Sequence, residues 1–539
     1  MTLSPRPVST PAPQGARALP SLTLLALLTV SGCSDMSLNS AKGADEASDD
    51  TGGAGDYDNG ATDSGDSAGG EDSAPPESEG DFLKLAPAAT DAYVFVANPD
   101  RNTVTRIAVP SLAVDTRDVG KNPVVVATST DYSHAVTFNA GTDDVSIIES
   151  VSFDVTNVAV RDNFNTMQMS TDGEWVMCWY DQAQEAVDPS GGVQSFNEVS
   201  FVNLDRAEHT GMAVGFNPRG VRWTPDGRLA LVISDAALAV IDLTAETLSP
   251  TLIYIADDPV NAPPAEEVEL TEDGRYAYVR QFGSSEILVV NLDDLTVDPI
   301  AVGENPTDLD ISPDGQEVAV VSRGSHELWV LQAANPFETP EVLPFNPESS
   351  YGSVLYAGDG DQAVLYTNAT LLPKYAVWEP RSGSIEEHGL VKPVQTMGVS
   401  PTGGSLLVFH SLADAPDADT SSPFYGEYAL TLIDMDDARQ NPMWLPSAPE
   451  AYTTSEDGRY GFFIMEGRNF LETLHFDSLL YDEVLLKSQP VYIGALPGTS
   501  VAYASQEHEL GRISFYDPDA TTLDTVTGFE LNSEIDHEE

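Results

Sequence analysis

A short turn signature recurs along most of the chain, and it constrains the fold more than any other feature of the sequence. Its clearest copies are Thr224-Pro225-Asp226-Gly227-Arg228 and Thr271-Glu272-Asp273-Gly274-Arg275. An Asp that bonds to nearby backbone and a Gly that accepts a positive φ favour a tight hairpin at each copy. Similar copies begin at Ser170, Ser312 and Ser455, and weaker ones lie at Asp91, Asp131, Asp359, Thr402 and Gly498.

The ten copies are 40 to 55 residues apart, with a mean spacing near 45 residues. A period of this size, with several short strands in each unit, indicates the blades of a β-propeller. One unit shows the pattern, with strands expected over 306–312, 317–321 and 327–331 and a poorer fourth strand before the next copy. We therefore predict an all-β propeller of four-stranded blades over residues 81–539.

Three arrangements of these units remain open. Ten units exceed the common range of about 4–8 blades. All ten close one wide ring, or seven or eight close a ring and the others are degenerate extensions, or two rings of five lie side by side. We favour one continuous propeller of 7–10 blades.

Several segments resemble the YVTN-type β-propeller repeat family. Tyr93-Val94-Phe95-Val96-Ala97-Asn98 is close to the strand that names the family, and Asn102-Thr103-Val104-Thr105-Arg106-Ile107 matches the strand that follows it. Gly120-Lys121-Asn122-Pro123 and Gly303-Glu304-Asn305-Pro306 match the turn before an inner strand. The resemblance covers residues 85–535 and implies a propeller. It specifies function poorly, because propellers host binding modules, lyases, lactonases and redox enzymes.

Residues 1–33 are expected to form a targeting segment. Arg6 and Arg17 precede an apolar run over 21–30 that is too short to span a bilayer as a helix. Val30-Ser31-Gly32-Cys33 resembles the lipobox of bacterial lipoproteins, which implies that Cys33 is acylated and becomes the first mature residue. An ordinary secretory signal is the alternative. Ser34 resembles the outer-membrane sorting pattern, so we expect a lipid-anchored envelope protein, on the periplasmic face or the cell surface.

Composition restricts the classes of partner. With 86 acidic and 24 basic residues, the formal charge is −62, which excludes a general nucleic-acid binder because phosphate contacts need clustered Lys and Arg. Residues 34–80 are nearly all small or acidic, which predicts a disordered, charged tether. Two Cys cannot build a disulfide framework. We expect a monomer that contacts the membrane only through its lipid anchor.

Two of the intervals are long because inserts, Asp181 to Asn197 and Ser411 to Tyr425, lie between the second and third strands of the third and eighth units. In a propeller these loops share one face with the loops that lead into each inner strand. Insertions in repeat proteins often mark the binding face. The predicted binding face comprises Asn122, Asn217, Asn305, His410, Asp414, Asp417, Asp419, Phe424 and Tyr425.

Each of these candidates also has an ordinary structural interpretation. Asn122, Asn217 and Asn305 precede inner strands, where they either ring the mouth with amide donors or cap a turn. The three Asp residues have a spacing that would suit Ca²⁺ ligation, although an acidic solvated loop is the simpler interpretation. His410 lies beside the second insert, where a lone surface histidine is the default. No cofactor other than this Ca²⁺ is expected.

No catalytic constellation is visible in the sequence. The eight His residues lack metal-ligand spacing, and the sequence contains no nucleophile elbow and no phosphate-cradling glycine loop. We therefore favour a binding or interaction scaffold for a protein, peptide or glycan ligand. The alternatives are a lactonase- or lyase-type enzyme with a metal at the channel mouth, for which Glu304, Asn305 and Asp308 are candidates, and a purely structural spacer.

Overall fold

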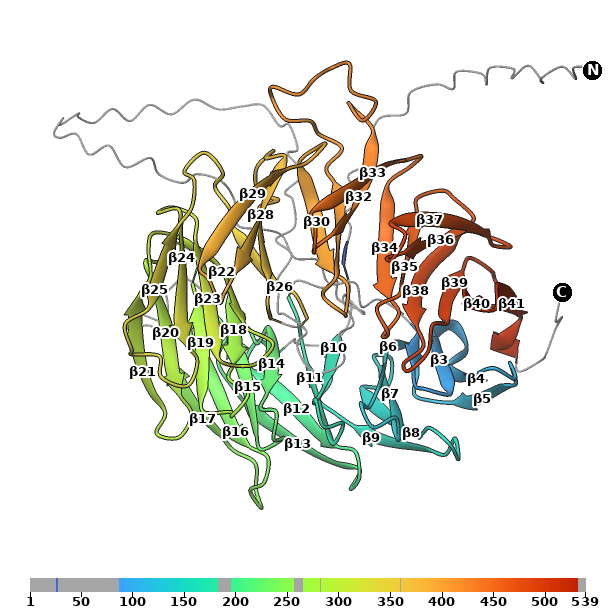
Figure 1. The fold of residues 1–539 in the computed structure, drawn as a ribbon. Helices are drawn as coiled ribbons and strands as arrows, with labels where there is room; N and C mark the ends of the chain where they lie inside the picture. The colour runs from blue at the N-terminus through green and yellow to red at the C-terminus, as the bar shows by residue number, and fades with distance from the viewer. Residues whose placement is uncertain are drawn as a thin grey trace, which may run out of the picture.

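The chain folds into ten four-stranded antiparallel sheets that follow one another around a central axis (Figure 1). The computed structural model describes residues 26–27, 87–182, 195–255, 265–281, 283–358 and 360–531. Each sheet uses four consecutive strands, so every blade comes from one continuous stretch of chain. The predicted all-β propeller is confirmed, and the blade number is ten.

The strands of each blade run in order from the axis to the rim. The inner strands are β2 (Ala88–Ala89), β6 (Pro123–Thr128), β10 (Thr166–Met169), β14 (Gly220–Trp223), β18 (Glu267–Leu270), β22 (Pro306–Ile311), β26 (Ser353–Tyr356), β30 (Val394–Val399), β34 (Pro449–Thr454) and β38 (Pro490–Ala495). The second strands are β3 (Tyr93–Asn98), β7 (His134–Asn139), β11 (Trp175–Trp179), β15 (Leu229–Ser234), β19 (Tyr276–Arg280), β23 (Glu317–Ser322), β27 (Ala363–Tyr366), β31 (Ser405–His410), β35 (Tyr460–Met465) and β39 (Ala502–Gln506).

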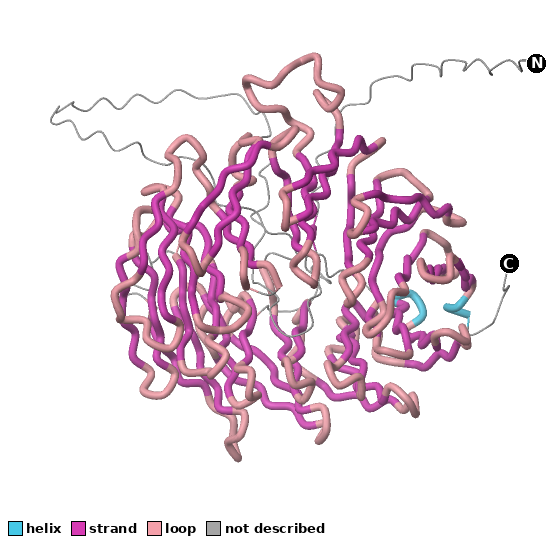
Figure 2. Tube along the Cα trace, in the orientation of Figure 1, coloured by secondary structure: helices cyan, strands magenta, loops and turns pink. Residues whose placement is uncertain are grey.

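The two outer strands of each blade complete the wedges seen in Figure 2. The third strands are β4 (Thr103–Ala108), β8 (Asp144–Glu149), β12 (Glu198–Asn203), β16 (Ala237–Asp242), β20 (Glu286–Asn291), β24 (Glu327–Gln332), β28 (Lys374–Glu379), β32 (Tyr428–Asp434), β36 (Phe470–His475) and β40 (Arg512–Asp517). The outermost are β5 (Val114–Asp118), β9 (Val155–Ala159), β13 (Glu208–Ala213), β17 (Pro250–Tyr254), β21 (Thr296–Ala301), β25 (Glu341–Pro344), β29 (Ser384–Gly389), β33 (Arg439–Leu445), β37 (Leu480–Leu485) and β41 (Thr522–Thr527).

The remaining elements of the described chain are short. Two 3₁₀ helices, η1 (Pro99–Arg101) and η2 (Phe529–Leu531), flank the ring, and a two-residue strand β1 (Ala26–Leu27) pairs in parallel with β34. None of the helices in the described ranges has the length and apolar character that crossing a bilayer requires.

Burial follows the position of a strand within its blade. The second strands are buried on both sides, as in β15, where all six residues from Leu229 to Ser234 are buried. Such strands contain near-continuous Val, Ile, Leu and Ala, because neighbouring blades cover both of their faces. The outermost strands are more exposed, as in β21, where all residues except the half-buried Val297 and Ile300 are exposed.

The recurring corner joins the inner strand to the second strand, as the sequence predicts. In the fourth blade the Thr224 hydroxyl donates to Asp226 Oδ1 at 2.7 Å and accepts from the Leu229 amide at 2.9 Å. Asp226 Oδ1 also accepts from the Arg228 amide at 3.0 Å, and Gly227 has φ of 67°. A Cβ atom at Gly227 would collide with the Asp172 carboxylate of the third blade, so the glycine also permits close approach between corners.

Ten apolar layers hold the blades together, each between two consecutive blades. Aromatic side chains contribute to these layers: Tyr278 packs between the fifth and sixth blades, Phe462 between the ninth and tenth, and Phe463 between the eighth and ninth. The tenth layer joins the last blade to the first. The ring is therefore single and closed, which excludes two rings of five and a smaller ring with extensions.

Closure at the seam between the tenth and first blades uses side chains rather than an exchanged strand. Phe529 of η2 packs with Phe515 of the tenth blade and Val94 and Ile107 of the first. The Tyr503 hydroxyl donates to the Pro87 carbonyl at 3.0 Å. Since each blade is complete in itself, the free energy of this seam comes from burial of apolar area and a few polar contacts.

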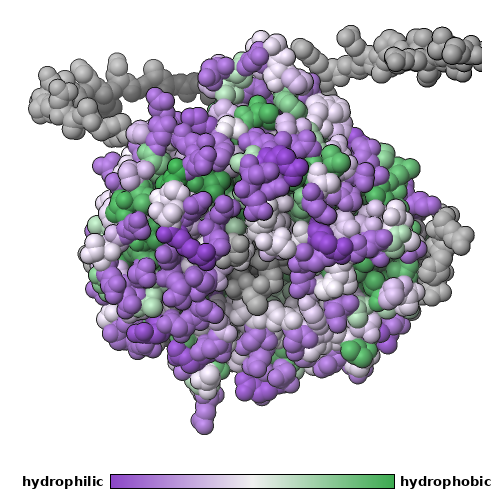
Figure 3. All heavy atoms as spheres, in the orientation of Figure 1, coloured by the Kyte–Doolittle hydropathy of each residue, from purple (hydrophilic) through white to green (hydrophobic). Residues whose placement is uncertain are grey.

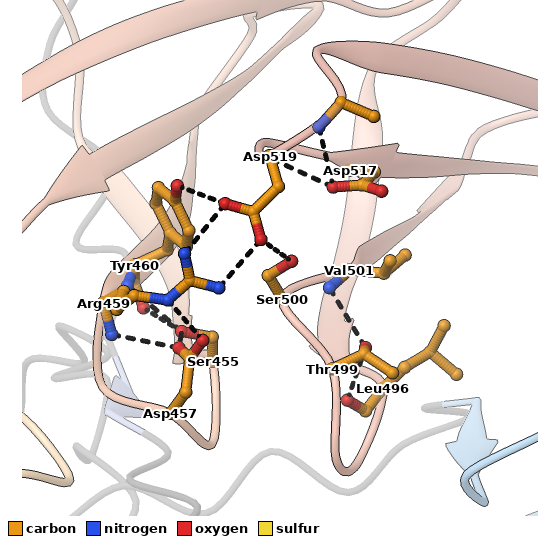
Figure 4. Close-up of polar contacts among 11 residues, drawn as sticks. Ser455, Asp457, Arg459, Tyr460, Leu496, Thr499, Ser500, Val501, Asp517 and Asp519 are labelled. Atoms are coloured by element: carbon orange, nitrogen blue, oxygen red, sulfur yellow. Dashed lines mark hydrogen bonds and ion pairs between the residues drawn. The ribbon is translucent and has the colours of Figure 1, made fainter.

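A polar clasp joins the ninth and tenth blades on the face of the ring that carries the recurring corners, which we call the corner face (Figure 4). Arg459 donates two hydrogen bonds of 2.8 Å to the two carboxylate oxygens of Asp519, which also accepts from the Tyr460 hydroxyl at 2.9 Å and from Ser500 Oγ at 3.0 Å. These donors hold the pKa of Asp519 well below its ordinary value. The ring of Tyr460 lies under the guanidinium of Arg459, 5.2 Å from its centroid.

We expect Phe529→Ala to weaken closure selectively. The side chain is 2% exposed and fills the seam, so its removal should lower the free energy of unfolding by about 3–5 kcal/mol. Chemical denaturation measures this value. Phe337→Ala, at a phenylalanine that is 61% exposed, is the control and should change stability little. Equal effects of the two substitutions would contradict the proposed closure.

Candidate binding face

The loops between second and third strands share one face of the ring with the loops that lead into each inner strand. Hydrogen bonds link the two kinds of loop directly, as three examples show. The Asn122 amide donates to Asn102 Oδ1 at 2.9 Å, the Asn163 amide to Asp143 Oδ1 at 2.8 Å, and the Gly283 amide to Asn305 Oδ1 at 3.3 Å. We call this side the insert face, because both inserts belong to it.

The three predicted asparagines adopt left-handed backbone conformations at equivalent turns. Their φ values are 50° for Asn122, 55° for Asn217 and 51° for Asn305, a region that Asn tolerates better than most residues. The side chain of Asn217 donates to Asp235 Oδ1 at 3.0 Å, and that of Asn305 accepts from Gly283. These contacts give the asparagines a turn-forming role on the insert face.

The eighth insert projects from this face between β31 and β32, as the orange loop at the top of Figure 1. A buried lysine fastens it to the propeller. Lys392 Nζ donates to Asp414 Oδ1 at 2.5 Å, to the Leu412 carbonyl at 3.1 Å and to the Phe424 carbonyl at 3.2 Å. The lysine side chain is 1% exposed, so all three donors of its ammonium group are used inside the protein. We call this contact set the Lys392 anchor.

His410 lies beneath the insert and is buried, which corrects its interpretation as a surface residue. Its Nδ1 lies 3.0 Å from the Lys392 carbonyl and 3.3 Å from the Pro393 carbonyl, and its Nε2 lies 2.7 Å from Thr431 Oγ1. Burial lowers the pKa of His410 to about 4, so the ring is neutral at pH 7. The histidine therefore positions the segment that carries Lys392.

The other insert residues have separate roles. Asp414 bonds to Lys392 and accepts from the Gly426 amide at 2.8 Å. Asp419 accepts from the Ser421 amide and hydroxyl, which lowers its pKa, and Asp417 is exposed. Phe424 is half-buried. Within the described ranges, no three His, Cys, Asp or Glu side chains form a group that could hold a metal, so the structure gives the Ca²⁺ prediction no ligand set.

Exposed aromatic rings lie beside the third insert, of which residues 183–194 fall outside the described ranges. Tyr180 and Phe196 pack edge to face with centroids 5.7 Å apart, and Phe216 follows 6.3 Å from Phe196. Phe216, on the loop that leads to β14, is 62% exposed. We call these three residues the third-insert patch. Asp181, where the insert begins, donates its amide to Asn165 Oδ1 at 2.7 Å.

A second group of exposed aromatic residues lies beside the eighth insert. Tyr425 is 44% exposed and Trp444, on β33, is 51% exposed. Trp444 Nε1 donates to Glu427 Oε2 at 3.3 Å, which orients the indole. We call Tyr425 and Trp444 the eighth-insert patch. Since the third and eighth blades are five apart in a ring of ten, the two patches lie opposite each other across the mouth.

Buried charged residues of the fourth, fifth and sixth blades form ion pairs and hydrogen bonds that the sequence pattern does not reveal. Arg222 pairs with Glu269 of the next blade at 3.0 Å, and Arg280 pairs with Glu267 at 2.7 Å. Glu267 Oε2 also accepts from the Leu309 amide of the sixth blade at 3.0 Å. The Arg222–Glu269 pair and the Glu267–Leu309 hydrogen bond connect consecutive blades, whereas Arg280 and Glu267 pair within the fifth blade.

The residues considered for the enzyme alternative are dispersed among structural roles. Asp308 is buried, and its Oδ2 accepts from the Val354 amide of the seventh blade at 2.7 Å. Glu304 is exposed, and its backbone amide donates to Ser325 Oγ at 3.2 Å. Asn305 forms the turn described above. Cys178 is buried between the second and third blades, where desolvation raises the pKa of its thiol far above the ordinary value.

Comparison with known proteins supports the fold and no more specific relationship. No family model matches the chain, and no curated protein matches its sequence. A solved structure of a eukaryotic initiation factor is similar, with a TM-score of 0.51 and 12% identity, over 75% of this chain and 96% of that one. Such low identity shows the propeller architecture alone.

Two enzyme structures share less of the geometry. The dihydro-heme d1 dehydrogenase NirN matches with a TM-score of 0.43 and 17% identity, over 66% of this chain and 73% of that one. A putative 6-phosphogluconolactonase from Bacteroides uniformis matches with a TM-score of 0.35 and 14% identity, over 54% of this chain and 92% of that one. The resemblance to YVTN-type repeats rests on the sequence segments alone, and Cys33 lies outside the described residues.

Lys392→Met should release the eighth insert. Breaking the buried pair leaves Asp414 without its cation, so the free energy of unfolding should fall by roughly 3–5 kcal/mol, and limited proteolysis should cut within residues 411–427. The double variant Lys392→Met/Asp414→Asn should recover part of the loss. Arg381→Met removes the exposed pair with Asp361 and should cost no more than about 1 kcal/mol. An insert that resists protease in Lys392→Met would show that other contacts hold it.

A buried carboxylate in the ninth blade makes stability depend on pH. Glu472 on β36 is fully buried, and neither of its carboxylate oxygens has a hydrogen-bond partner. Arg468 Nε lies 3.8 Å away, and Glu483 adds repulsion from β37. Desolvation, reinforced by Glu483, raises the pKa of Glu472 to about 7.

We expect the free energy of unfolding to fall as pH rises from 4.5 to 7, because the folded state holds the Glu472 proton more tightly than the unfolded state. The loss from this group reaches roughly 3 kcal/mol and is constant above pH 7. Glu472→Gln should remove this dependence, matching the wild type at pH 4 and exceeding it at pH 8 in denaturant titrations. A variant no more stable than the wild type at pH 8 would contradict the assignment.

Proposed function

We propose that this protein is a surface-anchored lipoprotein whose propeller acts as a binding scaffold through its insert face. The single observation that carries the proposal is the pair of exposed aromatic patches, one beside each insert and opposite each other across the ring. Exposed aromatic side chains are enriched at sites of molecular recognition, because they bury a large area for little loss of conformational freedom.

The surrounding surface supports a localised site. On the side of the molecule that Figure 3 shows, the surface is largely hydrophilic and hydrophobic groups form separate patches. Near the third insert, Asp235 accepts from Arg219 Nε at 2.8 Å and from Asn217, and Arg161 pairs with Glu198 at 2.9 Å. Aromatic rings bordered by satisfied polar groups resemble the centre and rim of a typical binding interface.

The anchored state belongs to the proposal. The lipobox-like segment ending in Cys33 and the acidic stretch over residues 34–80 would place the propeller at a distance from the membrane. A rigid ring on a long tether can present one face to a partner in solution or on another surface. The partner is a protein, peptide or glycan.

The proposal is tested by probing peptide and glycan arrays with the full-length protein. Phe216→Ser removes the most exposed ring of the third-insert patch, and Trp444→Ser removes that of the eighth-insert patch. An aromatic at the centre of an interface contributes about 2 kcal/mol or more, so either substitution should weaken a ligand bound at its patch by tenfold or more.

Phe337→Ser is the matched control. Phe337 is 61% exposed, close to the 62% of Phe216, but it lies between the third and outermost strands of the sixth blade, on the opposite face. It should leave every array signal unchanged. Ligands that respond equally to all three substitutions, or to none, would contradict the assignment of the insert face.

A further inference from the structure

The eighth insert carries a negative charge that no cation of the loop offsets. Residues 411–427 contain four Asp and Glu residues and no Lys or Arg. Lys392 balances Asp414 inside the protein, but Asp417, Asp419 and Glu427 are exposed. Hydrogen bonds from Ser421 lower the pKa of Asp419, so this carboxylate is ionised at neutral pH.

At two other places in the molecule, an arginine covers an aromatic ring and also bonds to a carboxylate. Arg459 lies over Tyr460 and bonds to Asp519, as Figure 4 shows. Arg106 lies 4.7 Å from the ring centroid of Tyr93 and donates to Asp115 Oδ2 at 2.8 Å. In both cases a cation contacts an aromatic face and a carboxylate together, a combination of cation–π attraction and ion pairing.

The eighth-insert patch has the ring and the carboxylate of this arrangement. The indole of Trp444 bonds at its edge to Glu427, and the exposed half of the residue is open to another contact. Over the part of the chain that the structure describes, no Arg or Lys lies above Trp444 or Tyr425. A cation from outside the molecule would complete the same set of contacts.

The patch is also held in place before any partner arrives. The Lys392 anchor fixes both ends of the insert, and tight turns within it join Ala418 to Ala415 and Ser422 to Asp419. A site whose backbone is already ordered loses less conformational entropy on binding than a flexible loop does.

We propose that the eighth-insert patch docks a basic segment of a partner protein, with Lys or Arg side chains over Trp444 and Tyr425 and beside Glu427, Asp417 and Asp419. This inference rests on the proposed function and adds the class of partner. Charge complementarity favours this occupant, because the protein has a formal charge of −62 and the patch has no cation of its own.

The test measures binding of a fluorescein-labelled peptide of alternating Arg and Gly to the full-length protein by anisotropy, at about 0.15 M salt, where long-range attraction is screened. Peptides with Gln or Glu in place of Arg are the ligand controls. Trp444→Ser should weaken the Arg peptide about fivefold, as expected for loss of a cation–π contact. Asp417→Asn/Asp419→Asn should weaken it by a similar factor.

Two control variants separate docking from general attraction to an acidic surface. Phe337→Ser removes an aromatic, and Asp154→Asn/Asp205→Asn removes two exposed carboxylates, all on the corner face. Both should bind the Arg peptide as the wild type does. Equal binding by all variants, or equal loss in all, would overturn the proposal.

The outcome can be distinguished from failure of the proposed function. The arrays could yield a neutral or acidic ligand whose binding is weakened by Phe216→Ser or Trp444→Ser, while Trp444→Ser leaves binding of the Arg peptide unchanged. The insert face then binds a partner, but that partner is not basic. If neither the arrays nor the Arg peptide respond to substitutions on the insert face, both proposals fail.

Discussion

Every blade of this protein depends on its neighbours to bury its apolar faces. A single four-stranded sheet such as β14 to β17 exposes Val, Leu and Ile on both sides of its second strand, and only a blade on each side removes them from water. The tenth layer, between the last blade and the first, satisfies the two ends of the series. Closure of the ring is therefore the condition under which the other nine layers are complete, and the positions of the insert face and the corner face follow from it.

The sequence predicts the local parts of this architecture well. The corner is a local unit, in which Thr224, Asp226 and Gly227 form hydrogen bonds with one another and with residues within five positions. Its structure can therefore be predicted from the sequence alone. The inserts are predicted with equal ease, because they lengthen a regular period. The blade number needed the structure, since closure depends on contacts between residues such as Val94 and Phe515, which are more than four hundred positions apart.

The candidate site was harder to predict for a physical reason. A lone lysine in an acidic chain is normally solvated, and only its position beneath the insert makes Lys392 an internal tie for Asp414 and two carbonyl groups. The burial of His410 is equally hard to predict, because it arises in the fold, where the ring lies beside the Pro393 carbonyl. Phe216 lies on the loop that leads into the fourth blade, although it borders the insert of the third blade. Trp444 lies on an outermost strand. The period of the repeat alone therefore assigns neither residue to a binding patch. Arg222 and Glu269 meet only because consecutive inner strands converge near the axis.

The seam has a mechanical consequence. The described part of the propeller begins at Pro87, whose carbonyl is held by Tyr503, and continues directly into β2, an inner strand of two residues. Tension applied to the chain immediately before Pro87 would therefore reach the shortest inner strand of the ring before any other strand of the ten blades. It would act beside the one junction where no peptide bond links the two blades. A pull from that side would peel the first blade strand by strand, whereas the nine covalently linked junctions would carry load only afterwards.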